Sequence, residues 1–117
     1  MIVGITNYHF DELVEKFGVT KCGYCGCDLH EDNTTIDHMR PKSRGGQDRI
    51  ANLILCCRSC NATKRAKTVD EFRFYKSMCE FGSRTGVVFS QQQVSYLESI
   101  GVKLDIRAHT FPFEVLE

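Results

Sequence analysis

Two Cys-x-x-Cys pairs constrain the fold of this chain more than any other feature. The first pair is Cys22 and Cys25, and the second is Cys57 and Cys60. Each pair presents two thiolates on one short turn, so the two pairs together can complete the tetrahedral shell of a structural zinc ion. Four sulfur ligands leave no position for a water molecule. We therefore expect this zinc to stabilise the fold and to take no part in catalysis.

The seven cysteines of the chain are an odd number, which favours metal ligation or free thiols over a set of disulfides. A disulfide pair or two buried thiols are the alternatives to zinc. Gly23 follows Cys22 and Gly26 follows Cys25, as tight metal-binding turns often require, and this favours the pair over Cys27 as the ligands. Cys56 ends an apolar segment and is predicted to be a small buried hydrophobic residue. No metal-binding role is predicted for Cys79.

The length of 117 residues, 42% of them hydrophobic, suffices for one compact domain and is too short for two independent cores. No apolar run approaches the ~18 residues that a membrane span requires, so we expect no membrane partner. Residues 1–8 lack the basic and then apolar layout of a signal peptide. These features predict a soluble protein of the cytoplasm.

Charge is segregated along the chain, although 15 basic and 15 acidic residues give a net charge of zero. Residues 40–67 hold eight of the basic residues and a single acid, Asp48, which leaves seven bases and fourteen acids for the rest. A solvated basic surface is the simpler interpretation of such a stretch. The same stretch, however, holds nearly every chemically suggestive residue, which favours DNA as the partner.

The predicted secondary structure of the first half is mixed. Apolar residues at helical spacing predict a helix from Asn7 to Gly18. Two short extended segments, Thr34–Met39 and Leu53–Cys56, are predicted strands, and a helix is predicted from Arg58 through Lys67. The side chains of adjacent strand residues point to opposite faces, so Asp37 and His38 cannot both face one site in a regular strand. A local bulge, or a phosphate that lies across the end of the strand, would allow both to reach the same site.

The second half predicts two helices that each begin with a capping box, Thr68 with Glu71 and Ser90 with Gln93. Their predicted buried faces are Phe72, Tyr75, Met78 and Cys79 in the first helix and Val94, Leu97 and Ile100 in the second. The tail from Val102 to Glu117 gives only weak strand signals.

The segment IDHMRPKSRGGQDRIANLILCCRSCNATK, residues 36–64, closely resembles the core of the HNH endonucleases. It has the family's Asp-His, Pro, Gly-Gly, middle Asn, Cys-x-x-Cys and final Asn at matching spacing. With the first cysteine pair the resemblance covers about residues 20–67. It implies an α+β fold, a small ββα-metal (HNH or His-Me finger) core with structural zinc knuckles and flanking helices. We expect one HNH endonuclease domain over residues 1–117, with a catalytic core of about 20–67 and a C-terminal helical extension of about 68–117.

The resemblance also implies roles for individual residues. His38 takes the position of the general base, and Asn52 takes the middle position that orients that base. Asp37 and Asn61 take the positions of the catalytic metal ligands. Because Asn61 replaces the histidine of the family name, both protein ligands offer oxygen, which suits Mg²⁺ or Mn²⁺ better than zinc.

These roles predict a DNA endonuclease that hydrolyses phosphodiester bonds by a one-metal mechanism with a histidine base. The basic side chains expected at the DNA phosphates are Lys42, Arg44, Lys64 and Arg65. Taken singly, each candidate has a structural explanation: a surface histidine, a turn asparagine, a helix cap or a hairpin loop. Their occurrence together, in order, favours the catalytic interpretation.

Two other functions stay open at this point. One is an inactive zinc-stapled module that binds nucleic acid or protein, since a fold does not guarantee an activity. The other is a nickase or auxiliary subunit that depends on a larger protein partner or a homodimer. The sequence does not fix the DNA specificity or the biological role, and a gene carried by a phage or mobile element is one of the origins that remain open.

Overall fold

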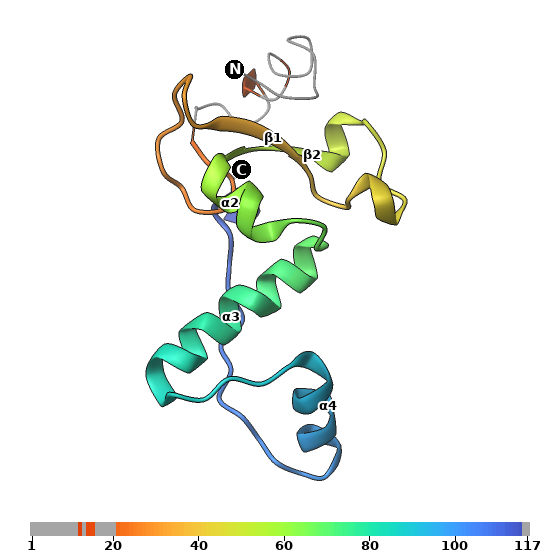
Figure 1. Cartoon of the computed structure of the whole chain (residues 1–117), viewed down its shortest axis with the longest axis vertical. Helices are drawn as coiled ribbons and strands as arrows, with labels where there is room; N and C mark the ends of the chain where they lie inside the picture. The colour runs from red at the N-terminus through yellow and green to blue at the C-terminus, as the bar shows by residue number, and fades with distance from the viewer. Residues whose placement is uncertain (1–11, 13, 16–20, 116–117) are drawn as a thin grey trace. The chain divides into compact units, whose positions relative to one another are not determined.

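The computed structural model describes residues 12, 14, 15 and 21–115, so the helix predicted from Asn7 to Gly18 falls largely outside the described residues. The chain divides into two compact units (Figure 1). One comprises residues 1–69 and 111–117, and the other comprises residues 70–110. The organisation as a single domain with a core and an extension stays a prediction.

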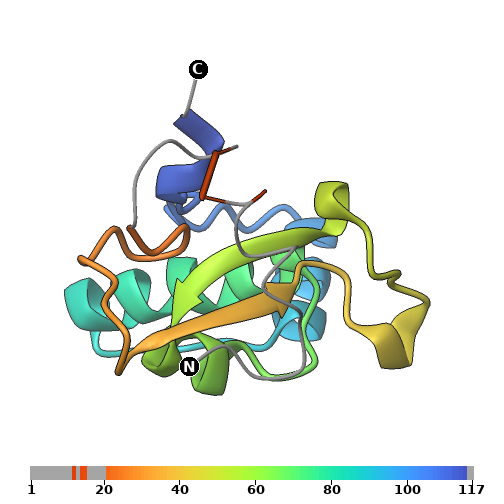
Figure 2. The same ribbon diagram turned by 90° about the horizontal axis from the view of Figure 1, so that it is seen from above.

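A hairpin of two antiparallel strands lies at the centre of the first unit (Figure 2). Strand β1, Thr34–His38, pairs with β2, Leu53–Cys57, in a register that runs without interruption from Thr34 opposite Cys57 to His38 opposite Leu53. All of β2 is buried, as expected for a short strand that is apolar throughout. Both predicted strands are confirmed to within a residue at their ends, and their regular pairing leaves no bulge at Asp37.

Helix α2, Arg58–Lys64, follows β2 directly and completes a ββα arrangement. The Cys57 side chain caps its first turn by accepting a hydrogen bond from the Cys60 amide. The helix ends three residues before the predicted Lys67, because Arg65 adopts a φ of 53° and leaves the helical conformation. The predicted α+β class is confirmed, and the order strand, strand, helix agrees with a ββα-metal core.

The C-terminal segment belongs to the first unit and packs against its first cysteine turn. Phe111 is fully buried, and its ring meets that of Tyr24 edge to face with 5.3 Å between centroids. The Phe113 amide donates to the Gly23 carbonyl at 3.0 Å. A short 3-10 helix, Pro112–Val115, follows, and no strand forms between residues 102 and 115. The strand weakly predicted for the tail is therefore absent from residues 102–115, and packing of Phe111 against Tyr24 holds the end of this segment in place.

Helix α3 extends over Val69–Thr85 and begins one residue after Thr68, as predicted. Phe72 and Met78 are buried as expected, but Tyr75 and Cys79 are exposed, so that part of the predicted face is wrong. The buried stripe instead includes Ser77 and Phe81. Ser77 is buried because its hydroxyl donates to the Arg73 carbonyl and accepts from the His109 amide, which holds the segment after α4 against this side of α3.

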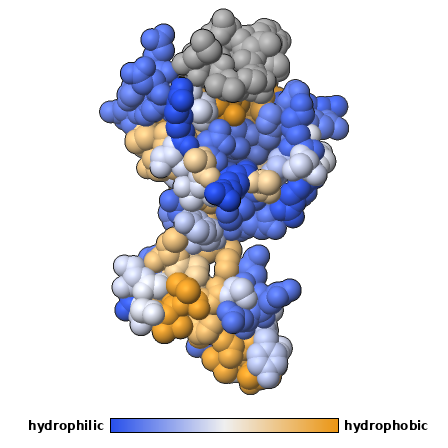
Figure 3. Space-filling model, viewed as in Figure 1, coloured by the Kyte–Doolittle hydropathy of each residue, from blue (hydrophilic) through white to orange (hydrophobic). Residues whose placement is uncertain are grey.

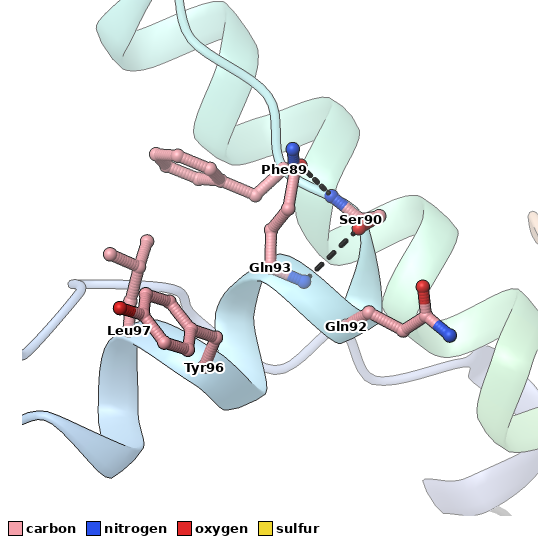
Figure 4. Close-up of a pocket in the computed structure, with 6 residues that line it drawn as sticks. All are labelled: Phe89, Ser90, Gln92, Gln93, Tyr96 and Leu97. Carbon is pink, nitrogen blue, oxygen red and sulfur yellow. Dashed lines mark hydrogen bonds between the residues drawn. The ribbon is translucent and has the colours of Figure 1, made fainter.

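Helix α4, Gln91–Ser99, has the predicted capping box (Figure 4). The Ser90 hydroxyl accepts from the Gln93 amide at 3.1 Å, and the Gln93 side chain accepts from the Ser90 amide at 2.8 Å. No residue of the helix is buried, however: Leu97 is half-buried and Ile100, just after the helix, is 57% exposed. The predicted burial of this face is wrong, because too little of the unit covers it.

The surface of the second unit is correspondingly apolar around α4 (Figure 3). Its exposed large hydrophobic residues include Val87, Val88, Tyr96 and Ile100. Among the described residues, no helix is both long and apolar enough to cross a membrane.

Candidate functional site

Four cysteine thiols lie close together in the first unit. The sulfur atoms of Cys22, Cys25, Cys27 and Cys57 all lie within 4.8 Å of one another. The Sγ atoms of Cys25 and Cys57 are 3.8 Å apart. Zinc–sulfur bonds of about 2.3 Å at tetrahedral angles put two sulfur ligands about 3.8 Å apart, so this spacing fits a zinc tetrahedron. The cluster can hold a metal ion.

The two cysteine pairs form matching turns. The Cys25 amide donates to Cys22 Sγ at 3.3 Å, and the Cys60 amide donates to Cys57 Sγ at 3.4 Å. Such N–H donors stabilise a thiolate on Cys22, the first cysteine of its turn. The predicted ligands Cys22, Cys25 and Cys57 are therefore together, whereas the fourth member of the close group is Cys27. Cys60 is not in this close group, but its thiol shares a hydrogen bond with that of Cys22.

The packing of these sulfur atoms separates their pKa values. The hydrogen bond from the Cys60 thiol, helped by backbone amides and opposed by burial, lowers the pKa of Cys22 to about 4. The same bond and burial raise the pKa of Cys60. Burial and the neighbouring thiols raise the pKa of Cys27 to about 12. Thiolates this close repel one another, so several can ionise together only beside a cation, and sulfur donors suit zinc.

Asp37 is buried on β1 and meets two other elements through one carboxylate oxygen. Its Oδ2 accepts a hydrogen bond from the Tyr24 hydroxyl at 2.8 Å and lies 2.9 Å from the Lys64 ammonium. Tyr24 belongs to the first cysteine turn, and Lys64 is the last residue of α2. Burial, followed by the charge of Asp37, raises the pKa of the Tyr24 hydroxyl, which keeps it protonated as a donor.

Lys64 is fully buried, although the sequence predicted it at the DNA phosphates. Besides its ion pair with Asp37, its ammonium donates to the main-chain carbonyl of His38 at 3.1 Å. The structure thus gives Lys64 interior partners in place of the exposed position that a phosphate contact requires. The other three predicted phosphate contacts, Lys42, Arg44 and Arg65, are exposed.

Asn61 lies on α2 and faces the same side of β1 as Asp37. Its side-chain amide donates to the Thr35 hydroxyl at 3.1 Å. Thr35 and Asp37 are two residues apart on one strand, so their side chains share a face. The fold therefore brings Asp37 and Asn61 to one face of the hairpin.

His38, at the end of β1, meets a carboxylate that the sequence analysis did not select. Its Nε2 is 2.5 Å from Asp48 Oδ1, and the Lys42 ammonium donates to the other oxygen of Asp48 at 3.2 Å. The hydrogen bond to His38, followed by that to Lys42, lowers the pKa of Asp48. The His38 side chain is 19% exposed, so a reactant can reach it.

Asn52 holds the loop between the strands and makes no contact with the His38 ring among the hydrogen bonds of the described residues. Its side chain accepts from the Arg40 amide at 2.9 Å and donates to the carbonyls of Arg40 and Gln47 at 3.1 and 3.0 Å. Gly46 allows the loop to close, because a Cβ there would lie 1.8 Å from the Arg40 carbonyl oxygen. Asn52 therefore acts on the backbone beside His38.

The sequence model of the HNH endonuclease family matches residues 22–67. These residues are similar to an HNH domain, and this stretch is called the HNH domain from here on. The match includes both cysteine pairs and the whole ββα arrangement, and it indicates a nuclease or nucleic-acid-binding function. No curated protein sequence and no solved structure matches the chain.

Two polar partners inside the HNH domain, Tyr24 and Asp48, were missed from the sequence. Tyr24 lies between the two cysteines of the first pair, and nothing in the sequence there indicates a polar role. Only the structure shows that its hydroxyl is buried. Asp48 carried a usable signal, since it is the single acid of the basic stretch. A lone carboxylate among eight cations is expected to have a specific partner.

We expect the HNH domain to bind about one equivalent of zinc and to unfold when a chelator removes it, because structural zinc supplies about 10–16 kcal/mol in small domains. Metal analysis of protein purified without added zinc checks the content. Cys57→Ser should lose the metal. Cys56→Ser is the matched control, since Cys56 is equally buried but lies outside the close thiol group. Less than half an equivalent in the wild type would contradict the zinc assignment.

Proposed function

We propose that this chain is a metal-dependent DNA endonuclease that hydrolyses phosphodiester bonds with His38 as the general base. One observation carries the proposal. His38 is a partly exposed imidazole at a strand end, held by a carboxylate, and it directly follows a buried aspartate on the strand that faces α2. In a segment that matches the HNH family, this arrangement supports a base beside a metal site.

Asp37 and Asn61 are the proposed ligands of the catalytic metal. The hydrogen bonds described above use Oδ2 of Asp37 and the amide nitrogen of Asn61. The Oδ1 atom of each is therefore the one proposed to face the metal. Two oxygen donors of this kind suit Mg²⁺ or Mn²⁺, with water and phosphate completing the shell. When bound, such an ion would polarise the scissile phosphate and stabilise the leaving oxygen.

The chain's own groups would perform the proton transfer and hold the substrate. His38 would remove the proton from the attacking water through the ring nitrogen that does not face Asp48. Since β1 has no bulge, Asp37 and His38 would serve one phosphate that lies across the strand end. Lys64 would keep Asp37 and the His38 backbone in place, and the exposed Lys42, Arg44 and Arg65 would contact DNA phosphates.

For the structural zinc we propose Cys60 as the fourth ligand, with Cys22, Cys25 and Cys57. Cys60 belongs to a turn with the same amide-to-sulfur bond as the first pair, and its thiol is hydrogen-bonded to that of Cys22. The metal analysis decides between them: Cys60→Ser should lose zinc, and Cys27→Ser should retain it. The opposite result would assign Cys27 instead.

The direct test of the activity is cleavage of plasmid DNA in Mg²⁺ or Mn²⁺. His38→Ala should slow cleavage by the ~10²–10⁴-fold that a positioned base contributes, because no other group would take the proton. His30→Ala is the matched control, since His30 is exposed and lies before β1. A loss of only twofold in His38→Ala would contradict the role of His38.

The form of the product separates the remaining candidates. Binding without any cleavage would support the inactive module. Nicking without linearisation would support a nickase that depends on a larger partner or on a second copy of the chain.

DNA binding should weaken as salt rises, because the exposed basic residues would release counterions from the phosphates. The slope of log K against log salt should be about −0.9 for each phosphate contacted. Arg44→Gln should make this slope shallower by about one unit and weaken binding similarly on different sequences. Lys103→Gln, an exposed lysine of the second unit, should leave the slope unchanged. Binding that is insensitive to salt would exclude the basic stretch as the DNA contact.

A further inference from the structure

The loop between β1 and β2 brings a single acid to the imidazole at the end of β1. Asp48 Oδ1 lies 2.5 Å from His38 Nε2, ten residues away in sequence. An ionised carboxylate has no proton to donate, so the proton of this hydrogen bond must sit on Nε2. In a neutral imidazole the other nitrogen, Nδ1, is then the acceptor.

We propose that Asp48 is the positioning residue of His38: it fixes the ring and the tautomer in which Nδ1 is the free base nitrogen. This inference rests on the proposed function, since a base needs one unprotonated nitrogen directed at the attacking water. A carboxylate that orients a histidine base by accepting from its other nitrogen is a recurrent device in catalysis.

Asp48 is itself held in two ways. Its second oxygen accepts from the Lys42 ammonium at 3.2 Å, so both oxygens are directed. The residue before it, Gln47, is tied to Asn52 through the bond from the asparagine amide to the Gln47 carbonyl at 3.0 Å. The Asp48 side chain is 49% exposed, and an exposed ion pair alone would do little to hold the His38 ring. The hydrogen bonds of the loop are therefore needed to keep Asp48 beside His38.

The same Asn52 side chain also fixes the strand end that carries His38. It accepts from the Arg40 amide at 2.9 Å and donates to the Arg40 carbonyl at 3.1 Å. The main-chain carbonyl of Asn52 also accepts from the Met39 amide at 2.7 Å. One asparagine therefore ties together the backbone just after His38 and the backbone just before Asp48. Asn52 orients the base indirectly, by fixing the distance between the histidine and its carboxylate.

The tautomer can be measured directly by long-range ¹H–¹⁵N correlation spectra of the zinc-loaded full chain labelled on histidine nitrogen. The spectra are recorded at about pH 8, where unperturbed imidazoles are neutral. The His38 signals are assigned from their loss in His38→Gln. We expect the wild type to show a protonated Nε2 and an unprotonated Nδ1. Asp48→Ala should give a mixture of tautomers, whereas Asp32→Ala, at an exposed acid before β1, should retain the wild-type pattern.

Cleavage kinetics supply the functional readout. Asp48→Ala should lower kcat by about 10- to 100-fold, the range typical of removing a carboxylate that orients a metal-bound histidine, with KM for DNA within about twofold. Asp48→Glu should restore part of the loss. An unchanged tautomer in Asp48→Ala, or a kcat within about twofold of the wild type, would overturn the inference.

The two readouts separate this inference from the proposed function. The spectra need no DNA, so they decide the contact between Asp48 and His38 even if the wild type does not cleave. A wild type that does not cleave would refute the proposed function. A wild type that cleaves, together with an Asp48→Ala variant that cleaves equally well, would refute only the role of Asp48.

Discussion

The buried carboxylate of Asp37 is the contact on which the organisation of the HNH domain depends. One oxygen of this side chain meets the Tyr24 hydroxyl and the Lys64 ammonium, so it links β1 to the first cysteine turn and to the end of α2. Removing one partner of a buried ion pair is strongly destabilising, because the other charge is left without compensation. Since Lys64 also binds the His38 carbonyl, the same contact fixes the backbone of the proposed base.

This contact would link the proposed zinc site, which has no chemistry of its own, to the proposed catalytic site. The cysteine turn that carries Cys22 and Cys25 also carries Tyr24, whose ring is fixed by Phe111 and Phe113. A metal ion that closes the turn would thereby hold the Tyr24 hydroxyl at Asp37. Loss of zinc would then affect the proposed metal ligand as well as the stability of the domain.

The sequence predicted those features that depend on local pattern. An apolar run predicted β2, the paired cysteines predicted a thiol cluster, and Ser90 with Gln93 predicted a capping box. It did not predict that Lys64 is buried or that Asp48 meets His38, because both depend on distances across the folded hairpin. Tyr75 and Cys79 were assigned to the core on helical periodicity alone, whereas the segment bound to Ser77 determines which side of α3 is covered. The choice between Cys27 and Cys60 has the same origin, since it depends on how near each sulfur lies to those of Cys22, Cys25 and Cys57 in the folded chain.

The central claim, that Asp37 holds a divalent ion between β1 and α2, can be tested without DNA. Zinc-loaded protein would be titrated with Mn²⁺ while the EPR signal of the free ion is followed. The account predicts about one bound Mn²⁺ per chain in the wild type, and loss of that site in Asp37→Asn, a variant that keeps an oxygen for the Tyr24 hydroxyl. The zinc content of this variant should be unchanged, which checks that the domain still folds although Lys64 has lost its charged partner. Asp32→Asn, at an exposed acid before β1, should bind like the wild type. Equal binding of Mn²⁺ by the wild type and by Asp37→Asn, with zinc content unchanged, would contradict the account.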